Sequence, residues 1–466
     1  MAYRRRRFLH NRRSYLRYCK TRICSRRVSC FRAFGINEPY CIGLFNTNVN
    51  GNPRKQFKYF YIFVCQRISC AFKLDKMKKV IDTERIPIKL WLDEIDENTL
   101  QQAKNLANLP FAFKHISLMP DAHSGYGMPI GGVMAAEGVI IPNAVGVDIG
   151  CGMCAVKTNL KLTPRIRKQL EVILDDIKRR VPVGFSHHKK TQDESLMPQN
   201  YDIDSMPVVK AEYTSALKQI GTLGGGNHFI EIQKDNDNIV WIMIHSGSRN
   251  IGKQVADRYN KIAKNLNNLW YSSVNPKADL AFLPFKTEEA RKYYNEMKYC
   301  VDFALANRKL MLTRVQEVLV DFFPKVSFGE IINIAHNYAT WENHFGRDVV
   351  VHRKGTTSAK KGELGIIPGS QGSNSYIVEG LGNPESFASC SHGAGRKMGR
   401  NEAIRTLDLE EEKRKLENKG IVHAIRGKKD LDEAPSAYKN ITRVMANQED
   451  LVKIIVELSP LAVIKG

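Results

Sequence analysis

Long apolar runs are missing from this sequence of 466 residues, in which no 18 consecutive positions are apolar. A membrane-spanning helix needs about 20 such residues, so we expect no membrane span. The string Gly-x-x-x-x-Gly-Lys-Ser/Thr is also absent, which excludes a Walker-type nucleotide site. No internal repeat is found. With 43% apolar and 26% charged residues, the composition is that of an ordinary globular protein.

Acidic residues are scarce in the first 76 positions, which hold 2 of them against 18 Lys or Arg. The whole chain has a net charge of +23, so most of that charge lies in this stretch. Six of the ten cysteines lie there too, without helical or strand period. An RNA-binding arm, a targeting peptide and a misassigned start remain open. We expect residues 1–76 to be a disordered basic extension or, preferably, sequence upstream of a true start at Met77.

From Met77 onward, strand-like and helical segments alternate, which indicates an α/β or α+β fold in one domain over residues 77–466. The four cysteines there are few and unevenly spaced, so we expect a cytoplasmic protein. Thr163 and Pro164 predict the start of a helix that ends near residue 180. We expect two helices within 287–324, a charged helix at 408–418 and a loop at 186–208. Strands are predicted at 229–232, 239–244, 331–334 and 375–378.

A glycine-rich run at 146–153 places Asp148 three residues before Cys151. Downstream, three histidines stand at the ends of apolar runs: His228, His245 and His336. Ligand side chains commonly gather where buried strands end, and carboxylate, thiolate and imidazole are usual ligands of transition metals. Each residue alone could be an ordinary core residue, but the set predicts a metal site. By donor type alone, zinc is favoured over manganese.

Three glycine-rich loops lie at 221–228, 368–376 and 391–396, and the last contains a histidine and an arginine. Such loops can bind phosphate through backbone N–H groups, although a single one is more typical of a tight turn. A compact basic group at 352–355 favours the phosphate interpretation.

Together these motifs resemble the RtcB family of RNA-splicing ligases over about Met77 to Gly466. The resemblance is carried, in the order of the family, by residues 119–127, 146–153, 226–229, 245–249, 335–338, 352–355, 391–396 and 465–466. It implies an α+β domain of mixed β-sheets with surrounding helices and a central metal cleft. The implied activity is GTP- and manganese-dependent joining of an RNA 3′-phosphate or 2′,3′-cyclic phosphate to a 5′-hydroxyl, in RNA repair or tRNA splicing.

The resemblance also implies roles for individual residues. One Mn²⁺ ion would be held by Asp148, Cys151 and His228, and a second by Cys151, His245 and His336. His392 would be the nucleophile that becomes guanylylated, and Tyr438 would stack on guanine. At Gln371 many members have Met, which puts that side-chain contact in doubt. The implied guanylate site is Asn227, His228, Phe229, Ile230, Glu231, His336, Asn337, Pro368, Gly369, Ser370, Gln371, Ser375, His392, Gly393, Ala394, Gly395, Tyr438 and Lys465.

Four cations are candidates for binding RNA or triphosphate: Arg249, Arg353, Lys354 and Arg396. The resemblance implies RNA as partner and leaves open an archease-type activator, and we expect a monomer. Asp121 and His123 either lie near the metals or fix a turn. Two other functions compete: a metal-dependent phosphodiesterase without a nucleotide, and a non-enzymatic RNA-binding protein. The phosphodiesterase needs neither the His392 loop nor Lys465, and a binding protein needs no pair of Asp148 and Cys151.

Overall fold

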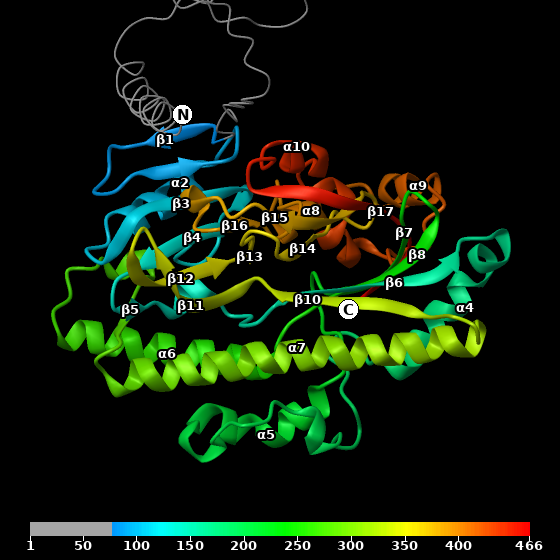
Figure 1. Cartoon of the computed structure of the whole chain (residues 1–466), viewed down its shortest axis with the longest axis horizontal. Coiled ribbons are helices and arrows are strands. Elements are labelled where there is room, and N and C mark those ends of the chain that lie inside the picture. The colour runs from blue at the N-terminus through cyan, green and yellow to red at the C-terminus, as the bar shows by residue number, and fades with distance from the viewer. Residues whose placement is uncertain (1–76) are drawn as a thin grey trace, which may run out of the picture. The chain divides into compact units, whose positions relative to one another are not determined.

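The structure, a computed structural model, describes residues 77–466 (Figure 1). The predicted N-terminal extension, residues 1–76, lies outside the described residues. The expected α+β architecture is confirmed, because mixed β-sheets and helices build this part of the chain. Most of its strands belong to two large sheets, and the site lies where strands of both sheets end.

The first large sheet has six strands in the order β1-β2-β3-β4-β12-β11. Only the pair β2–β3 is parallel, and the other neighbours in this sheet are antiparallel. β3 packs against α2 in one core cluster, and the C-terminal end of β3 carries Asp121. The strands are β1 (Lys79–Ile81), β2 (Ile88–Leu90), β3 (Ala112–His123), β4 (Ile130–Ala136), β11 (Asn337–His344) and β12 (Arg347–Lys354).

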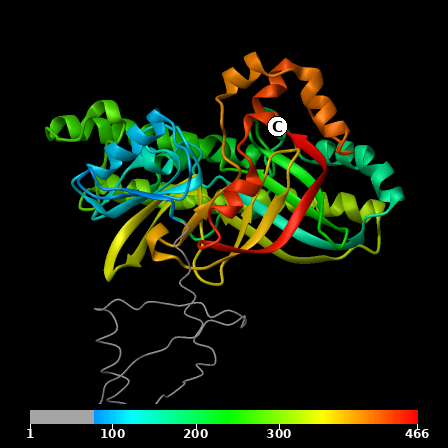
Figure 2. The same cartoon turned by 90° about the horizontal axis from the view of Figure 1, so that it is seen from above.

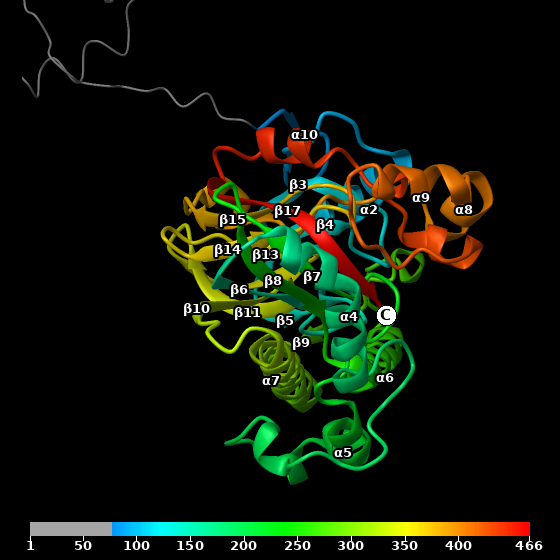
Figure 3. The ribbon, with the colours of Figure 1, turned by 90° about the vertical axis from the view of Figure 1, so that its right-hand side faces the viewer.

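The second large sheet has seven antiparallel strands in the order β10-β6-β8-β7-β17-β15-β14. Its edge strands β10 and β14 approach each other, so the sheet curls around a core that includes Met153, Met243 and Leu458 (Figure 3). The strands are β6 (Gly152–Lys161), β7 (Phe229–Lys234), β8 (Ile239–Ser246), β10 (Phe328–Ala335), β14 (Leu364–Ile367), β15 (Ser375–Gly380) and β17 (Val452–Lys465). Two short pairs accompany the large sheets: β5 (Val139–Ile140) with β9 (Leu283–Pro284), and β13 (Thr356–Ser358) with β16 (Ser389–Ser391).

Helices cover these sheets, and the longest, α7, runs along β10 and β11 (Figure 1). No helix in residues 77–466 combines the length and apolarity that crossing a bilayer requires. The α-helices are α2 (Glu97–Ala107), α3 (Pro142–Val145), α4 (Pro164–Arg180), α5 (Pro207–Gln219), α6 (Arg249–Leu269), α7 (Glu288–Phe322), α8 (Arg400–Thr406), α9 (Leu409–Glu417) and α10 (Ile441–Ala446). Short 3₁₀ turns are η2 (Glu194–Leu196), η3 (Ile203–Ser205), η4 (Pro276–Ala278), η5 (Pro384–Ser386), η6 (Lys428–Glu433) and η7 (Pro435–Ala437).

Most sequence-based elements are confirmed. Thr163 caps α4 by accepting a hydrogen bond from the N–H of Ile166, and the predicted charged helix is α9. The four predicted strands are β7, β8, β10 and β15, each slightly longer than expected. β10 differs in one respect: it is an edge strand, so its apolar run is covered on fewer sides and Ile331 is 39% exposed.

The prediction of two helices within 287–324 is wrong, because α7 is one continuous helix of 35 residues. No Gly or Pro occurs in Glu288–Phe322 to interrupt the backbone hydrogen bonds. Fifteen of its residues are buried, so packing against several strands extends it well beyond the average helix length. Cys300 lies in this helix and is fully buried, as expected for a core residue.

Candidate metal centre and histidine loop

Cys151 lies in a tight turn between α3 and β6. Its N–H donates to the carbonyl of Asp148, and the N–H of Gly150 donates to the carbonyl of Asn337. Gly150 has a φ of +75° and packs so closely on α7 that a Cβ would lie 2.8 Å from the Cα of Val301. A side chain at this position would therefore push the turn away from α7. The turn holds Asp148 and Cys151 at the strand ends on one side of the second sheet.

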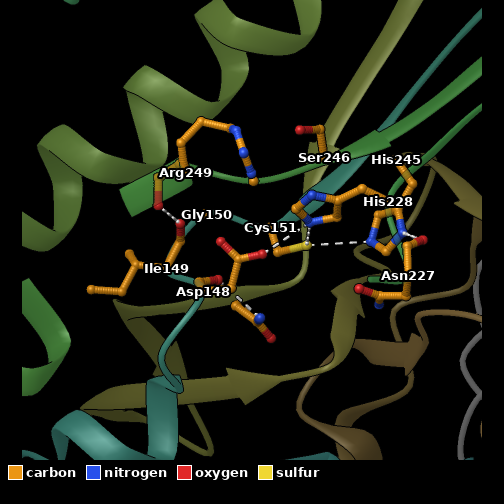
Figure 4. Close-up of polar contacts among 12 residues, drawn as sticks. Asp148, Ile149, Gly150, Cys151, Asn227, His228, His245, Ser246 and Arg249 are labelled. Atoms are coloured by element: carbon orange, nitrogen blue, oxygen red, sulfur yellow. Dashed lines mark hydrogen bonds and ion pairs between the residues drawn. The ribbon is translucent and has the colours of Figure 1, made fainter. Parts of the chain in front are cut away.

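Neighbouring strands of this sheet bring the three histidines to the same strand ends. His245 in β8 pairs with Met153 of β6 and with Phe229 of β7. His228 directly precedes β7, and His336 directly follows β10. Figure 4 shows the side chains of His228 and His245 directed at the sulfur of Cys151. The sequence-based prediction that these ligands meet at strand ends is thus matched by the geometry.

The donor atoms form two groups that share Cys151: Asp148, Cys151 and His228, and Cys151, His245 and His336. The Cys151 Sγ lies 3.5 Å from Nε2 of His228 and 3.3 Å from Nε2 of His245. His228 Nε2 is 3.1 Å from Oδ2 of Asp148, and the Nε2 atoms of His245 and His336 are 3.4 Å apart. Within each group the donor atoms lie within 4.8 Å of one another.

The hydrogen bonds of the imidazoles indicate that these donors suit a cation. Nδ1 of His228 faces the carbonyl of Leu223, and Nδ1 of His245 faces that of Asn227, each at 3.0 Å. A carbonyl only accepts, so Nδ1 carries the hydrogen and Nε2 presents a lone pair to the cluster. Burial lowers the pKa of His245, which keeps its ring neutral. Lone pairs, a carboxylate and a thiol that face one another suit a shared cation, so the residues fit a divalent metal.

α7 supports the cluster from behind through two adjacent buried residues, Asn307 and Arg308. Arg308 is fully buried and donates to the carbonyls of Gly150 and Ser246. Its Nε also donates to Oδ1 of Asn333, three residues before His336. These bonds fix the backbone beside three ligands. The sequence shows Asn307 and Arg308 only as part of a helix, and nothing local marks their role.

The side chain of Asn307 completes this support. Its Oδ1 accepts from the N–H groups of Gly221 and Thr222, and its Nδ2 donates to the carbonyls of Thr222 and Gly247 and to Oγ of Ser246. The amide therefore connects the loop before His228 with the loop after His245.

His392 follows the short strand β16 and contacts a single buried carboxylate. Its Nδ1 donates to Oδ2 of Asp121 at 2.7 Å, and the N–H groups of His392 and Gly393 donate to the same oxygen. Burial opposes ionisation of Asp121, but the neighbouring His392 lowers its pKa below the ordinary value. With the hydrogen on Nδ1, Nε2 of His392 is left with a lone pair. The ring centroid of His392 lies 4.9 Å from that of His336, so the ring lies beside the candidate metal cluster.

The sequence left it open whether Asp121 lies near the metals or fixes a turn. It lies in β3 and orients His392 although the two are 271 positions apart. Gly395 approaches the same segment so closely that a Cβ would lie 2.3 Å from the carbonyl oxygen of Asp121. His123 lies nearby and is partly buried, and burial lowers its pKa to about 4.

A second set of predicted residues surrounds the buried carboxylate of Glu433. Lys465 Nζ lies 3.6 Å from Glu433 and 5.8 Å from the ring centroid of Phe229. Arg396 pairs with Glu433 at 3.2 Å and lies over the ring of Tyr438, whose hydroxyl donates to Glu433. Figure 2 shows the C-terminal end of β17 beside the orange segment that holds α8 and α9. Glu433 was not among the predicted site residues, although it lies five residues before Tyr438.

The loop 368–371 packs next to this set. The N–H of Gly369 donates to Oγ of Ser375, which also accepts from Gln233. Gln371 is buried, and its side-chain amide donates to the backbone carbonyl of Glu433. Glu231 lies in β7 beneath them, and burial raises its pKa to about 8. Pro368 and Ser370 belong to the same loop, Ile230 lies in β7, and Ala394 follows His392.

Asn227 and Asn337 each connect two parts of the site. The carbonyl of Asn227 accepts from His245. Asn337 donates to the carbonyl of Asp148 and accepts from the N–H of Gly355. These bonds tie the metal ligands to the loops that surround His392.

The four predicted phosphate-binding cations have different surroundings. Arg249 begins α6 with a φ of +60° and directs its guanidinium toward Gly224 and His228, where Nε donates to Thr222 (Figure 4). Arg353 is fully buried and bonds Glu342, Ser389 and the carbonyl of Phe387. Lys354 is buried, and its ammonium donates to the carbonyls of Tyr126 and Asn143. Arg353 and Lys354 therefore bond loops of the protein itself, which leaves Arg249 and Arg396 nearest the site.

Comparison with known proteins agrees with this geometry. Residues 102–466 match the model of a family described as tRNA-splicing ligase RtcB. The chain belongs to the RtcB family. It is 39% identical to RNA-splicing ligase RtcB of Escherichia coli (strain K12) over 411 residues, which cover 83% of this chain and 99% of that protein. It is 32% identical to tRNA-splicing ligase RtcB of Thermococcus kodakarensis, with coverages of 82% and 95%. The family resemblance predicted from the motifs is confirmed.

Proposed function

We propose that the chain is an RNA ligase that joins an RNA 3′-phosphate or 2′,3′-cyclic phosphate end to a 5′-hydroxyl end with GTP. The observation that supports this best is the position of His392. Its Nδ1 donates to Asp121, and its ring packs beside His336, a member of the donor cluster. A nucleophilic nitrogen next to a metal cluster suits attack on a phosphate, and the RtcB relatives are named RNA-splicing ligases.

In this proposal Asp148, Cys151 and His228 hold one ion, and Cys151, His245 and His336 hold the other. Manganese is proposed from the family, whereas donor type alone would favour zinc. When bound, such ions polarise phosphate oxygens and offset the charge that develops on them. Burial raises the pKa of the Cys151 thiol, so the free thiol keeps its proton. Metal binding would displace that proton.

His392 performs the covalent chemistry. Its Nε2 lone pair attacks the α-phosphorus of GTP, an N–P bond forms, and the bond to pyrophosphate breaks. Asp121 keeps the proton on Nδ1 and stabilises the positive charge that the ring gains. An oxygen of the RNA 3′-phosphate then attacks the same phosphorus, and the N–P bond breaks. The 5′-hydroxyl finally attacks the activated RNA phosphate, GMP leaves, and the hydroxyl proton goes to solvent. A cyclic phosphate must first be opened by water.

The residues around Glu433 are the proposed guanylate pocket. Lys465 and Arg396 supply positive charge, and Tyr438 and Phe229 supply aromatic faces. The loop of Pro368–Gln371 and the loop of Asn227–Glu231 flank them. Arg249 is the proposed contact for an RNA or triphosphate oxygen, because its guanidinium lies beside His228 and Thr222 at the cluster.

The test is transfer of labelled GMP from GTP to the protein in the presence of Mn²⁺. We expect an adduct that is stable to alkali and labile to acid, as a phosphoramidate is, and none in His392→Ala. His423→Ala is the control, because His423 pairs with the exposed Glu417 of α9. A wild-type protein that cleaves cyclic phosphates but forms no adduct would instead be a phosphodiesterase.

A further inference from the structure

An aromatic side chain stands fully exposed beside this site. Phe185 is 98% exposed, more than any other large apolar side chain in residues 77–466. It lies after α4, one residue before the loop predicted at 186–208. A single exposed apolar side chain is ordinary by itself, so the inference depends on where this one is held.

The loop that carries Phe185 is held against the active site. The N–H of Gly184 donates to the carbonyl of Gly224 at 3.0 Å, and the N–H of Leu223 donates to the carbonyl of Pro182 at 2.9 Å. Leu223 in turn accepts from Nδ1 of the metal-ligand candidate His228. A Cβ on Gly184 would lie 3.7 Å from the last residue, Gly466, and Figure 3 shows the C-terminus beside α4.

The other end of the loop is fixed as well. The N–H of His188 donates to the carbonyl of Lys218, and its Nε2 contacts the guanidinium of Arg314 at 2.8 Å. A turn closed by Ser186 N–H and the carbonyl of Val183 lies between the two anchors. Because both ends are bonded, Phe185 is presented at a defined place rather than on a free tip.

The segment that carries Phe185 is basic. Residues 184–192 contain two lysines and two histidines, Lys189 and Lys190 are exposed, and the first acids, Asp193 and Glu194, follow this segment. His187 is exposed, and its pKa is lowered by partial burial and by Arg249. On the other side of the glycine loop, a Cβ on Gly226 would lie 3.2 Å from the guanidinium of Arg400.

An exposed ring followed by two exposed lysines fits a nucleic-acid strand. A base stacks on the ring while Lys and Arg contact phosphates. A protein partner would need a continuous apolar patch, but Phe185 is the only exposed apolar side chain in the described segment 184–192. A base within a duplex already stacks on both neighbours, so the ring suits an unpaired base.

We propose that the segment 184–190 binds an unpaired end of the RNA substrate, with Phe185 stacked on a base near the junction and Lys189 and Lys190 on its phosphates. The inference rests on the proposed ligase function. It adds a preference: ends with unpaired nucleotides should be joined more readily than ends held in a duplex up to the junction.

The experiment compares Phe185→Ala, Phe185→Leu and Phe185→Trp in two assays. GMP transfer to His392 needs no RNA and should be the same in all three. For joining of unpaired RNA ends, Phe185→Ala and Phe185→Leu should raise KM about 5- to 100-fold, and Phe185→Trp should restore it. For ends paired up to the junction, KM should change little. Melting temperatures should be unchanged, because the side chain is exposed.

A fluorescent base gives an independent signature. An RNA with 2-aminopurine at successive positions near its end should lose fluorescence at one position when it binds, and Phe185→Ala should prevent this loss. If GMP transfer fails in the wild type, the proposed function is wrong. If transfer occurs but KM and fluorescence do not respond to Phe185→Ala, only the stacking inference is wrong. If Phe185→Ala impaired only the binding of a protein activator, the stacking inference would also be wrong.

Discussion

The donor cluster and the His392 loop lie side by side, yet the protein supports them differently. Behind the cluster, Asn307 and Arg308 bond four separate segments that lead to or from the ligands. The orientation of the His392 ring depends on one carboxylate, Asp121. The difference indicates that the ligand positions belong to the folded core, whereas the ring of His392 can be misplaced without unfolding the protein.

The largest expected effect comes from Arg308→Met. It leaves the carbonyls of Gly150 and Ser246 and the Oδ1 of Asn333 without donors inside the core. Each such group costs about 1–3 kcal/mol, so the loss of three donors should lower the free energy of unfolding by at least about 3 kcal/mol. Mn²⁺ affinity should fall at least about 10-fold, because the ligand backbones are released. Urea unfolding and electron paramagnetic resonance of free Mn²⁺ measure the two.

Arg291→Met is the matched control, because Arg291 is exposed on the same helix. It should change neither quantity. If Arg308→Met kept wild-type stability and metal affinity, the cluster would not depend on α7 and the comparison would fail.

The next effect is on chemistry alone. Asp121→Asn keeps the shape but removes the charge that holds the proton on Nδ1 of His392. By analogy with other oriented histidines, the rate of GMP transfer should fall about 100- to 10,000-fold. Mn²⁺ affinity should stay within about threefold of the wild-type value, because Asp121 bonds none of the ligands. Rapid-quench measurement of labelled adduct gives the rate.

Asp235→Asn provides the control, since Asp235 is a buried carboxylate that bonds the N–H of Ile239 and the indole of Trp241. It should affect stability rather than GMP transfer. A fast Asp121→Asn enzyme would mean that His392 is oriented by other contacts.

The meeting of the candidate metal ligands could be predicted from the sequence for a physical reason. His228, His245 and His336 all stand where apolar strands end, and antiparallel neighbours bring such ends together. Asp121 and Arg308 could not be assigned this way. Their partners are far away in the chain, and a carboxylate in a strand or an arginine in a helix has no local pattern that reveals them. The length of α7 was missed because an average helix was assumed where no residue interrupts the helix.

The cations near the site show the same limit. Arg353 and Lys354 share a basic motif that favours phosphate, yet burial makes each bond the protein itself. Sequence gives the charge of a residue but not its exposure, and exposure decides whether a phosphate can reach it. Phe185 is the converse case. The sequence shows only a lone aromatic residue, and the structure is needed to show that it is exposed and held next to the site.

A smaller effect separates the two metal groups. A metal that binds only the folded protein stabilises it by about 2.7 kcal/mol at a free concentration 100 times its Kd. We expect Mn²⁺ to raise the melting temperature of the wild type. Cys151→Ala should abolish this rise, because its Sγ belongs to both groups, whereas Asp148→Asn should keep part of it. Equal loss in both variants, measured by calorimetry, would contradict two groups that share one thiolate.

The smallest effect on activity is expected behind β16. Arg353 bonds Ser389 and the carbonyl of Phe387, just before His392, and it pairs with Glu342 at 2.7 Å. Burial opposes ionisation of Glu342, but the hydrogen bond from His344 and the charge of Arg353 lower its pKa below the ordinary 4.5. The pair therefore stabilises the protein above about pH 4.5 and loses this contribution as the pH falls further.

Glu342→Gln should lower the free energy of unfolding by about 1–3 kcal/mol at pH 7, because a charged hydrogen-bond acceptor is lost. Between about pH 5 and 3 the variant should lose less stability than the wild type, since it has no carboxylate to protonate there. GMP transfer at pH 7 should change less than about threefold, because Asp121 still orients His392. Glu330→Gln, at an exposed position in β10, should leave the pH dependence unchanged. A large loss of transfer in Glu342→Gln would show that His392 depends on the strand behind it as much as on Asp121, and the two regions would then be supported alike.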